Sequence, residues 1–134
     1  MKPHEPQTKF VSAILSILAV VLLAGCSSRP SESTGRAVLQ NAIATESKGM
    51  IKLVSFRKTN GTGGGTYYHM EYEAQIEFSA TGTWYPLYLF TVGQVEPPPP
   101  LGHNVSAGHR ETVQGSLSFE KTERGWRGQD GNVY

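Results

Sequence analysis

The sequence has few of the residues that build disulfides, acidic active sites and membrane-spanning helices. Its 134 residues include a single cysteine, Cys26, and a single aspartate, Asp130. A lone cysteine cannot form a disulfide within the chain. The apolar run at residues 10–23 has 14 residues, whereas a helix that spans a bilayer needs about 20. The fold must therefore depend on packing and hydrogen bonds, and the apolar run needs another explanation.

A strong charge of either sign is also missing. The chain has 12 Lys and Arg residues and 11 Asp and Glu residues, which gives a formal net charge of +1. Without its first 25 residues it has 10 basic and 10 acidic side chains, because Lys2, Lys9 and Glu5 are removed. A neutral domain has no electrostatic field that would attract nucleic acid or an anionic surface. We therefore expect no nucleic-acid partner.

Residues 1–25 have the pattern of a secretory signal peptide. Residues 1–9 are polar and contain two lysines, residues 10–23 carry no charge, and the small residues Ala24 and Gly25 precede Cys26. A positive start, a short apolar core and a small-residue exit define a secretory signal. The alternative is a buried core helix, which the flanking lysines and the small-residue exit argue against.

The stretch Leu22-Leu23-Ala24-Gly25-Cys26 resembles the lipobox of bacterial lipoproteins, in which a branched apolar residue and two small residues precede a cysteine. The resemblance implies that a diacylglyceryl group alkylates the Cys26 thiol. It also implies cleavage between Gly25 and Cys26 by a lipoprotein signal peptidase, and acylation of the new amino group. The alternative is a chance cysteine beside an ordinary signal core.

Lipidation at Cys26 would make the chain a membrane-anchored protein of the cell envelope. Each buried CH₂ group contributes about 0.8 kcal/mol, so two or three acyl chains hold a protein firmly. With Cys26 modified, no thiol remains for a zinc site or for catalysis. In lipoproteins of diderm bacteria, an aspartate after the cysteine favours the inner membrane. Ser27 therefore predicts the outer membrane, facing the periplasm, if the source has one.

The remaining residues predict one domain after a short tether. Residues 26–35 are polar and rich in turn formers, which is typical of a flexible tether. Residues 36–134 have the length of a single domain with a modest core. Residues 36–48 predict the one helix, with Ser33 or Thr34 as its cap and Gly49 after its end. A proline-rich loop is expected near residues 93–110, with four consecutive prolines at 97–100.

Strands are predicted over most of the rest of the domain. The clearest signal is strict alternation at residues 68–78, where every second side chain is apolar. The alternating apolar residues are Tyr68, Met70, Tyr72, Ala74, Ile76 and Phe78. Further strands are predicted at residues 50–58, 87–92 and 112–121, with a short closing strand from Trp126. The glycine-rich residues 60–65 predict a turn between the first two strands.

One helix followed by four or five antiparallel strands predicts an α+β fold, with the N-terminal helix packed on a curved antiparallel sheet. This element order resembles cystatin-like and nuclear-transport-factor-like folds over residues 36–127. Residues 113–126 are also similar to the endings of small uncharacterised bacterial lipoproteins. Neither likeness implies an activity, because one fold serves many functions.

Few residues form a pattern associated with catalysis or ligand binding. The glycines at 61–65 lack the Lys-Ser/Thr and the helix of a phosphate loop. His69 shares a strand face with Glu71 and Glu73, where a solvated surface is the plainer interpretation. A second group, His103, His109 and Glu111, surrounds the proline-rich loop, but its spacing matches no zinc signature. We therefore expect no enzyme, no cofactor and no metal site.

An aromatic group at residues 84–90 is the most notable patch, and it comprises Trp84, Tyr85, Tyr88 and Phe90. These rings either fill the core of a small domain without disulfides or form an interaction patch on its surface. The core is the expected place for them. The neighbouring prolines strengthen the alternative of an interaction patch, because a preformed extended segment loses little entropy on docking.

Three functional hypotheses follow. The first is a non-catalytic envelope lipoprotein that binds a protein or another envelope component, with membrane lipid at its N-terminus. The second is a ligand-binding or enzymatic pocket of the kind that cystatin-like sheets form, which a deep cavity lined by Tyr68, Tyr72 and His109 would favour. The third is a purely structural or immunity-type lipoprotein, which the sequence does not separate from the first.

Overall fold

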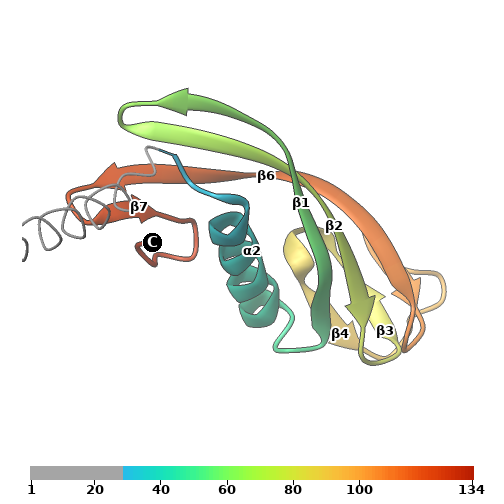
Figure 1. Ribbon diagram of the computed structural model, residues 1–134. Helices are drawn as coiled ribbons and strands as arrows, with labels where there is room; N and C mark the ends of the chain where they lie inside the picture. Colours follow the sequence, from blue (N-terminus) through green and yellow to red (C-terminus); the bar gives the residue numbers. More distant parts are fainter. Residues whose placement is uncertain (1–28) are drawn as a thin grey trace, which may run out of the picture.

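The computed structural model describes residues 29–134, so the predicted signal peptide and Cys26 lie outside the described residues. Its elements, in chain order, are helix α2 (Glu32–Glu46), strands β1 (Ile51–Gly64), β2 (Tyr67–Phe78) and β3 (Gly82–Trp84), the 3₁₀ turn η2 (Pro86–Tyr88), and strands β4 (Phe90–Val92), β5 (His103–Val105), β6 (Arg110–Thr122) and β7 (Gly125–Arg127). Helix α2 lies across the concave face of the long strands (Figure 1).

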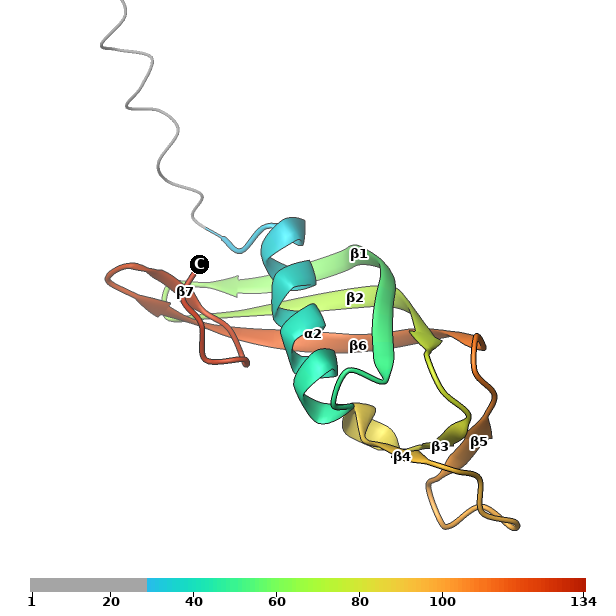
Figure 2. The ribbon, with the colours of Figure 1, turned by 90° about the horizontal axis from the view of Figure 1, so that it is seen from below.

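Two antiparallel sheets make up the strand layer. The large sheet has four strands in the order β1-β2-β6-β7, and the small sheet has three in the order β4-β3-β5. Figure 2 shows the small sheet beyond the C-terminal end of α2. The predicted α+β class and the helix on an antiparallel sheet are confirmed. The second sheet was not expected, because each of its strands has only three residues and so gives no periodic signal.

Helix α2 begins earlier than predicted. Ser31 is its N-cap, and the Ser31 hydroxyl oxygen accepts a hydrogen bond of 3.2 Å from the Thr34 amide. Such a cap satisfies one of the free amides at a helix start. Residues 32–35 are therefore helical, and their assignment to a flexible tether was wrong. At the other end the Ser47 hydroxyl donates to the Ile43 carbonyl at 2.6 Å, so the helix ends at Glu46 rather than at residue 48.

The β1–β2 hairpin is longer than the glycines suggested. Strand β1 continues to Gly64, and only residues 65 and 66 form the turn. Gly61 lies under the ring of Tyr68, and a Cβ at this glycine would come within 2.7 Å of the ring carbon Cζ. The predicted turn at residues 60–65 was wrong, because Gly61 belongs to a strand. A glycine there leaves room for the Tyr68 ring to pack on the backbone.

The alternation predicted along β2 is confirmed. Its even-numbered residues from Tyr68 to Phe78 are buried, and the odd-numbered ones lie on the other, more exposed face. Three buried residues of α2, Val38, Leu39 and Ile43, belong to the same core. Strand β6 pairs with β2 along its whole length and adds Leu117 and Phe119 to this core. Trp126 of β7 is also buried, as expected for a closing strand.

The region between β2 and β6 departs most from the prediction. Residues 87–92 do not form one strand, because Pro86 opens the turn η2 and both Leu87 and Tyr88 have positive φ angles. Only Phe90–Val92 is extended, as β4. The predicted loop at residues 93–110 contains the strand β5 and ends where β6 begins at Arg110.

The polar tail after β7 folds back onto α2. The side chains of Asn41 and Tyr134 donate hydrogen bonds of 2.9 and 2.6 Å to Oδ2 of Asp130. Burial raises the pKa of Asp130, but these bonds and those from Asn132 outweigh it and lower that pKa below its usual value. The single aspartate is therefore a structural acceptor that fastens the tail to the helix.

Gly35 lets α2 approach the sheet, and we predict that Gly35→Val destabilises the fold. A Cβ at this position would come within 2.9 Å of the Phe56 ring and would also meet the Met70 sulfur. Overpacking of this kind costs about 1–3 kcal/mol. Urea unfolding measures the loss. Gln40→Val places the same side chain on an exposed position of α2 and is the matched control. Equal losses in the two variants would contradict the close-packing explanation.

Candidate functional site

The aromatic group at residues 84–90 packs mainly inward. Trp84, Tyr88 and Phe90 are partly buried and lie against the core. Phe78 of β2 connects them, with ring centroids 5.4 Å from Trp84 and 6.0 Å from Phe90. Tyr85 is also only partly exposed. These rings therefore join the small sheet to the large one, and they do not form an exposed aromatic surface.

Tyr88 is fastened to β2 by a hydroxyl pair. Its hydroxyl lies 2.8 Å from the hydroxyl of Tyr72, and the two share a hydrogen bond. Burial raises the pKa of Tyr72, which the bond from Tyr88 partly offsets. Burial and the bond to Tyr72 both raise the pKa of Tyr88 well above its usual value. Both phenols are protonated at neutral pH, so the pair holds η2 in place and supplies no base.

Apolar side chains that the sequence interpretation missed are exposed around β4. Leu87 and Leu89 precede this strand, Val92 ends it, and Val95 and Leu101 lie in the loop that leads to β5. In the stretch from residue 81 to residue 109 the only Asp, Glu, Lys or Arg is Glu96, and Asn104 donates to its carboxylate at 2.7 Å. This end of the molecule therefore presents apolar side chains without opposing charge.

The two most exposed of these residues also have unusual backbones. Leu87 is 79% exposed with φ 64°, and Leu101 is 75% exposed with φ 65°. A left-handed conformation costs a non-glycine residue about 1–2 kcal/mol, and an exposed leucine offsets none of it by burial. Strain of this kind gathers at binding and switch sites. In the sequence, the only sign of this exposed turn is that Leu87 follows a proline, and the apolar residues after it equally predict a strand.

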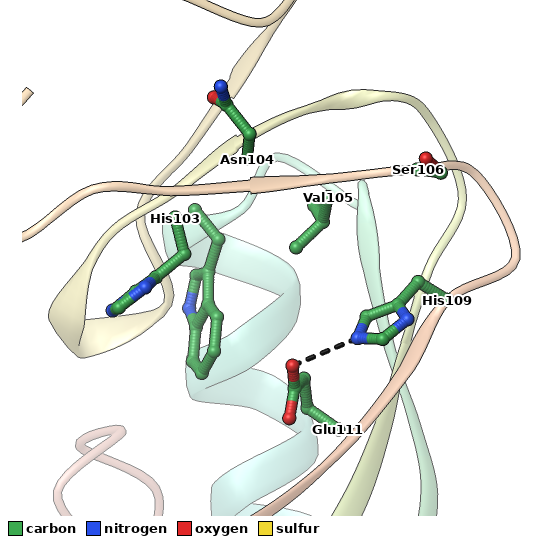
Figure 3. A pocket seen from close by; sticks show the side chains of 7 residues that line it. His103, Asn104, Val105, Ser106, His109 and Glu111 are labelled. Atoms are coloured by element: carbon green, nitrogen blue, oxygen red, sulfur yellow. Dashed lines mark hydrogen bonds and ion pairs between the residues drawn. The ribbon is translucent and has the colours of Figure 1, made fainter. Parts of the chain in front are cut away.

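An open cleft of about 460 Å³ lies between the small sheet and the start of β6. Its lining residues are Trp84, His103, Asn104, Val105, Ser106, His109 and Glu111. Figure 3 shows His109 pointing toward Glu111, with 2.9 Å between the imidazole Nε2 and a carboxylate oxygen. The predicted group of His103, His109 and Glu111 is thus brought to one cleft, with His103 on β5 and Glu111 at the start of β6.

Two ring contacts hold the imidazoles of the cleft. His109 stacks on Phe78 with ring centroids 6.1 Å apart, and His103 lies 5.8 Å from Trp84. The indole nitrogen of Trp84 is buried and has no hydrogen-bond partner in the described part of the chain. Such a donor costs free energy unless something pairs with it. The cleft therefore has one unpaired donor, buried in its wall, and one oriented His–Glu pair.

The other polar side chains singled out in the sequence lie on the surface of the described domain. Within residues 29–134 no three His, Cys, Asp or Glu side chains are grouped so that they could hold a metal ion. His69 lies 3.0 Å from the Ser118 hydroxyl, and Glu73 pairs with Arg57 at 3.0 Å on the solvent face. The hydrogen bond from Arg57 lowers the pKa of Glu73. Glu73 and Glu77 of β2 thus take part in cross-strand surface pairs, the second with Arg110 at 2.7 Å.

The residues of the alternative pocket are not brought together. Tyr68 is buried beside Trp126, with ring centroids 6.1 Å apart, Tyr72 pairs with Tyr88, and His109 lines the separate cleft. From Arg29 onward no helix is sufficiently long and apolar to cross a membrane.

Comparison of the chain with protein-family models, with curated proteins and with solved structures gave no match. Function is therefore argued from the geometry of the chain itself.

Leu87 carries a conformational cost, and we predict that Leu87→Asn stabilises the protein by about 1 kcal/mol. Asparagine tolerates the left-handed region better than leucine does, and the leucine side chain contributes little burial. Thermal unfolding measures the gain. Leu89→Asn is the matched control, because Leu89 is exposed on an extended backbone with φ −70°. A loss of stability in Leu87→Asn would show that the left-handed backbone of Leu87 does not carry this cost.

Proposed function

We propose that this chain is a membrane-anchored bacterial envelope lipoprotein whose α+β domain is a non-catalytic binding module. The observation that carries this proposal is the lipobox-like stretch that ends at Cys26. Only residues 27–30 separate Cys26 from the helix cap Ser31. A tether this short would hold the domain at the surface of the membrane. In a diderm source, Ser27 favours the outer membrane and a domain that faces the periplasm.

The placement of the exposed leucines supports a partner rather than the anchoring bilayer. Helix α2 has 15 residues, which corresponds to about 22 Å. Its first turn is next to the tether, and the small sheet lies beyond its last turn (Figure 2). If Cys26 is lipidated, Leu87 and Leu101 are on the end of the domain remote from the tether. Residues 81–109 at that end carry no Asp, Glu, Lys or Arg apart from Glu96, and their exposed apolar side chains suit an envelope protein with an apolar contact surface.

The finer resemblance to cystatin-like folds is part of the same proposal. A helix followed by long antiparallel strands, with the helix across their buried face, supports it. The small sheet inserted between β2 and β6 is an addition to that layout. A structural or immunity-type lipoprotein is a special case of this proposal, because the same anchor and domain would serve it.

We predict that the purified mature chain begins at a lipid-modified Cys26. Mass spectrometry of the intact protein, made with its own leader, should show the loss of residues 1–25 and the added mass of acyl groups. Cys26→Ser should retain the leader and carry no lipid, because serine lacks the nucleophilic thiolate. A wild-type protein that carries no lipid and fractionates as soluble would refute the anchor.

A small-ligand pocket is the second candidate, and the unpaired indole donor of Trp84 is the observation that favours it. Together with His109 and Glu111 this donor could bind a small molecule that carries an acceptor such as a carboxylate. The cleft is open to solvent, and its histidine–glutamate pair is half exposed. These features suit a weak ligand site better than a catalytic one.

The two tryptophans of the chain make this second candidate testable. We predict that, if the cleft binds carboxylates, acetate shifts the indole N–H resonance of Trp84 in a ¹⁵N-correlated NMR spectrum. The resonance of Trp126, which lies in the buried core near Tyr68, is the internal control. Trp84→Phe assigns the two signals. Equal shifts of the two resonances, or no shift at saturating acetate, would exclude this candidate.

A further inference from the structure

Strand β4 uses only alternate residues to bond with β3. The Tyr85 amide donates to the Leu89 carbonyl at 2.9 Å, and the Gly93 amide donates to the Thr81 carbonyl at 3.1 Å. In an antiparallel pair the hydrogen-bonded residues alternate with residues whose backbone groups point the other way. The backbone amide and carbonyl groups of Leu89, Thr91 and Gly93 therefore point toward β3.

The backbone groups of Phe90 and Val92 consequently point away from β3. Strand β4 is an edge of the small sheet, and within residues 29–134 no hydrogen bond reaches these outward amides and carbonyls. An unpaired apolar edge is a template for another strand. Natural edges are protected by short length, by lysine, by proline or by a bulge. Strand β4 is short, with three residues, but its sequence Phe-Thr-Val contains no lysine or proline and its register is regular.

We propose that this edge pairs with β4 of a second copy of the chain. A two-fold axis through Thr91 would place Phe90 opposite Val92 of the other copy, and both residues have outward backbone groups. In each copy the backbone amides of Phe90 and Val92 would donate hydrogen bonds to the other copy, and their carbonyls would accept them. The same residues then serve both copies, as an isologous contact requires. The exposed side chains of Leu89 and Val92 would be covered at the same time.

Charge supports a second copy as the occupant. A two-fold contact brings every charge close to its own image, so a charged edge repels itself. Residues 81–95 contain no Asp, Glu, Lys or Arg, and this contact is therefore free of such repulsion. The inference goes beyond the proposed anchor and does not depend on it.

A cysteine on the two-fold axis tests the pairing. Thr91 would face Thr91 of the other copy at a non-hydrogen-bonded position, where Cα atoms are about 4.5 Å apart, which is within disulfide range. The full chain with Thr91→Cys is produced with its own leader, oxidised mildly and run on a non-reducing gel. A disulfide-linked dimer is expected to form roughly tenfold or more faster than for a thiol that meets its copy by collision.

Two further variants make the result specific. Thr62→Cys places a thiol at another exposed strand position, in β1, and reports the collision rate. Val92→Pro, added to Thr91→Cys, removes an outward donor and leaves the bonds to β3 intact, so cross-linking should fall to the Thr62→Cys rate. If Val92→Pro lowers the unfolding temperature, Val92→Lys replaces it, because the two lysine side chains would lie diagonally across the two-fold axis and repel each other.

Each other outcome has a definite meaning. Equal cross-linking rates for Thr91→Cys and Thr62→Cys would overturn the proposal. A cross-link from Thr91→Cys to a different polypeptide would assign the edge to another partner and would also overturn it. A disulfide dimer of the wild-type chain would show a free Cys26, which contradicts the anchor alone. The edge test would then be repeated with Cys26→Ser in every variant.

Discussion

The packing of helix α2 on the buried face of the large sheet is the contact on which the rest of the structure depends. With a single cysteine in the chain, no disulfide supports the fold, and burial of apolar side chains must overcome the entropy of folding. Each fully buried large side chain contributes about 1.5–3 kcal/mol. Gly35 lets the helix come close, and the bonds of Ser31 and Ser47 define its two ends.

Phe78 transmits this packing to the small sheet. It is the last residue of β2, it is fully buried, and its ring contacts Trp84, Phe90 and His109. The hydroxyl pair of Tyr72 and Tyr88 adds a second connection between the layers. A sheet with strands of three residues is too short to be stable alone. The small sheet therefore keeps its shape because aromatic rings attach it to the core, and this leaves its outer edge and its turns free for contacts.

The functional interest of the molecule lies in what this attached sheet exposes. Leu87 and Leu101 combine high exposure with left-handed backbones, and β4 has an open edge between them in the chain. Neither feature stabilises the described domain. Both are what one expects of a surface whose apolar groups are covered in a complex. The cleft around His109 is less developed, since its polar groups are partly satisfied by each other and it is open to solvent.

The sequence alone determined the α+β class, the helix, the long alternating strand β2 and the strand β6, because periodic burial is written directly into the order of apolar residues. It also predicted that His103, His109 and Glu111 surround one loop. Only the tertiary structure decided whether Trp84, Tyr88 and Phe90 are core or surface, since a ring is buried by residues distant in sequence, here Phe78 and Tyr72. The same holds for the small sheet, whose three-residue strands form because partners far along the chain offer hydrogen bonds. The lipobox-like stretch differs from both, because the lipidation proposed for it would depend on local recognition of Leu22 to Cys26 and not on tertiary contacts.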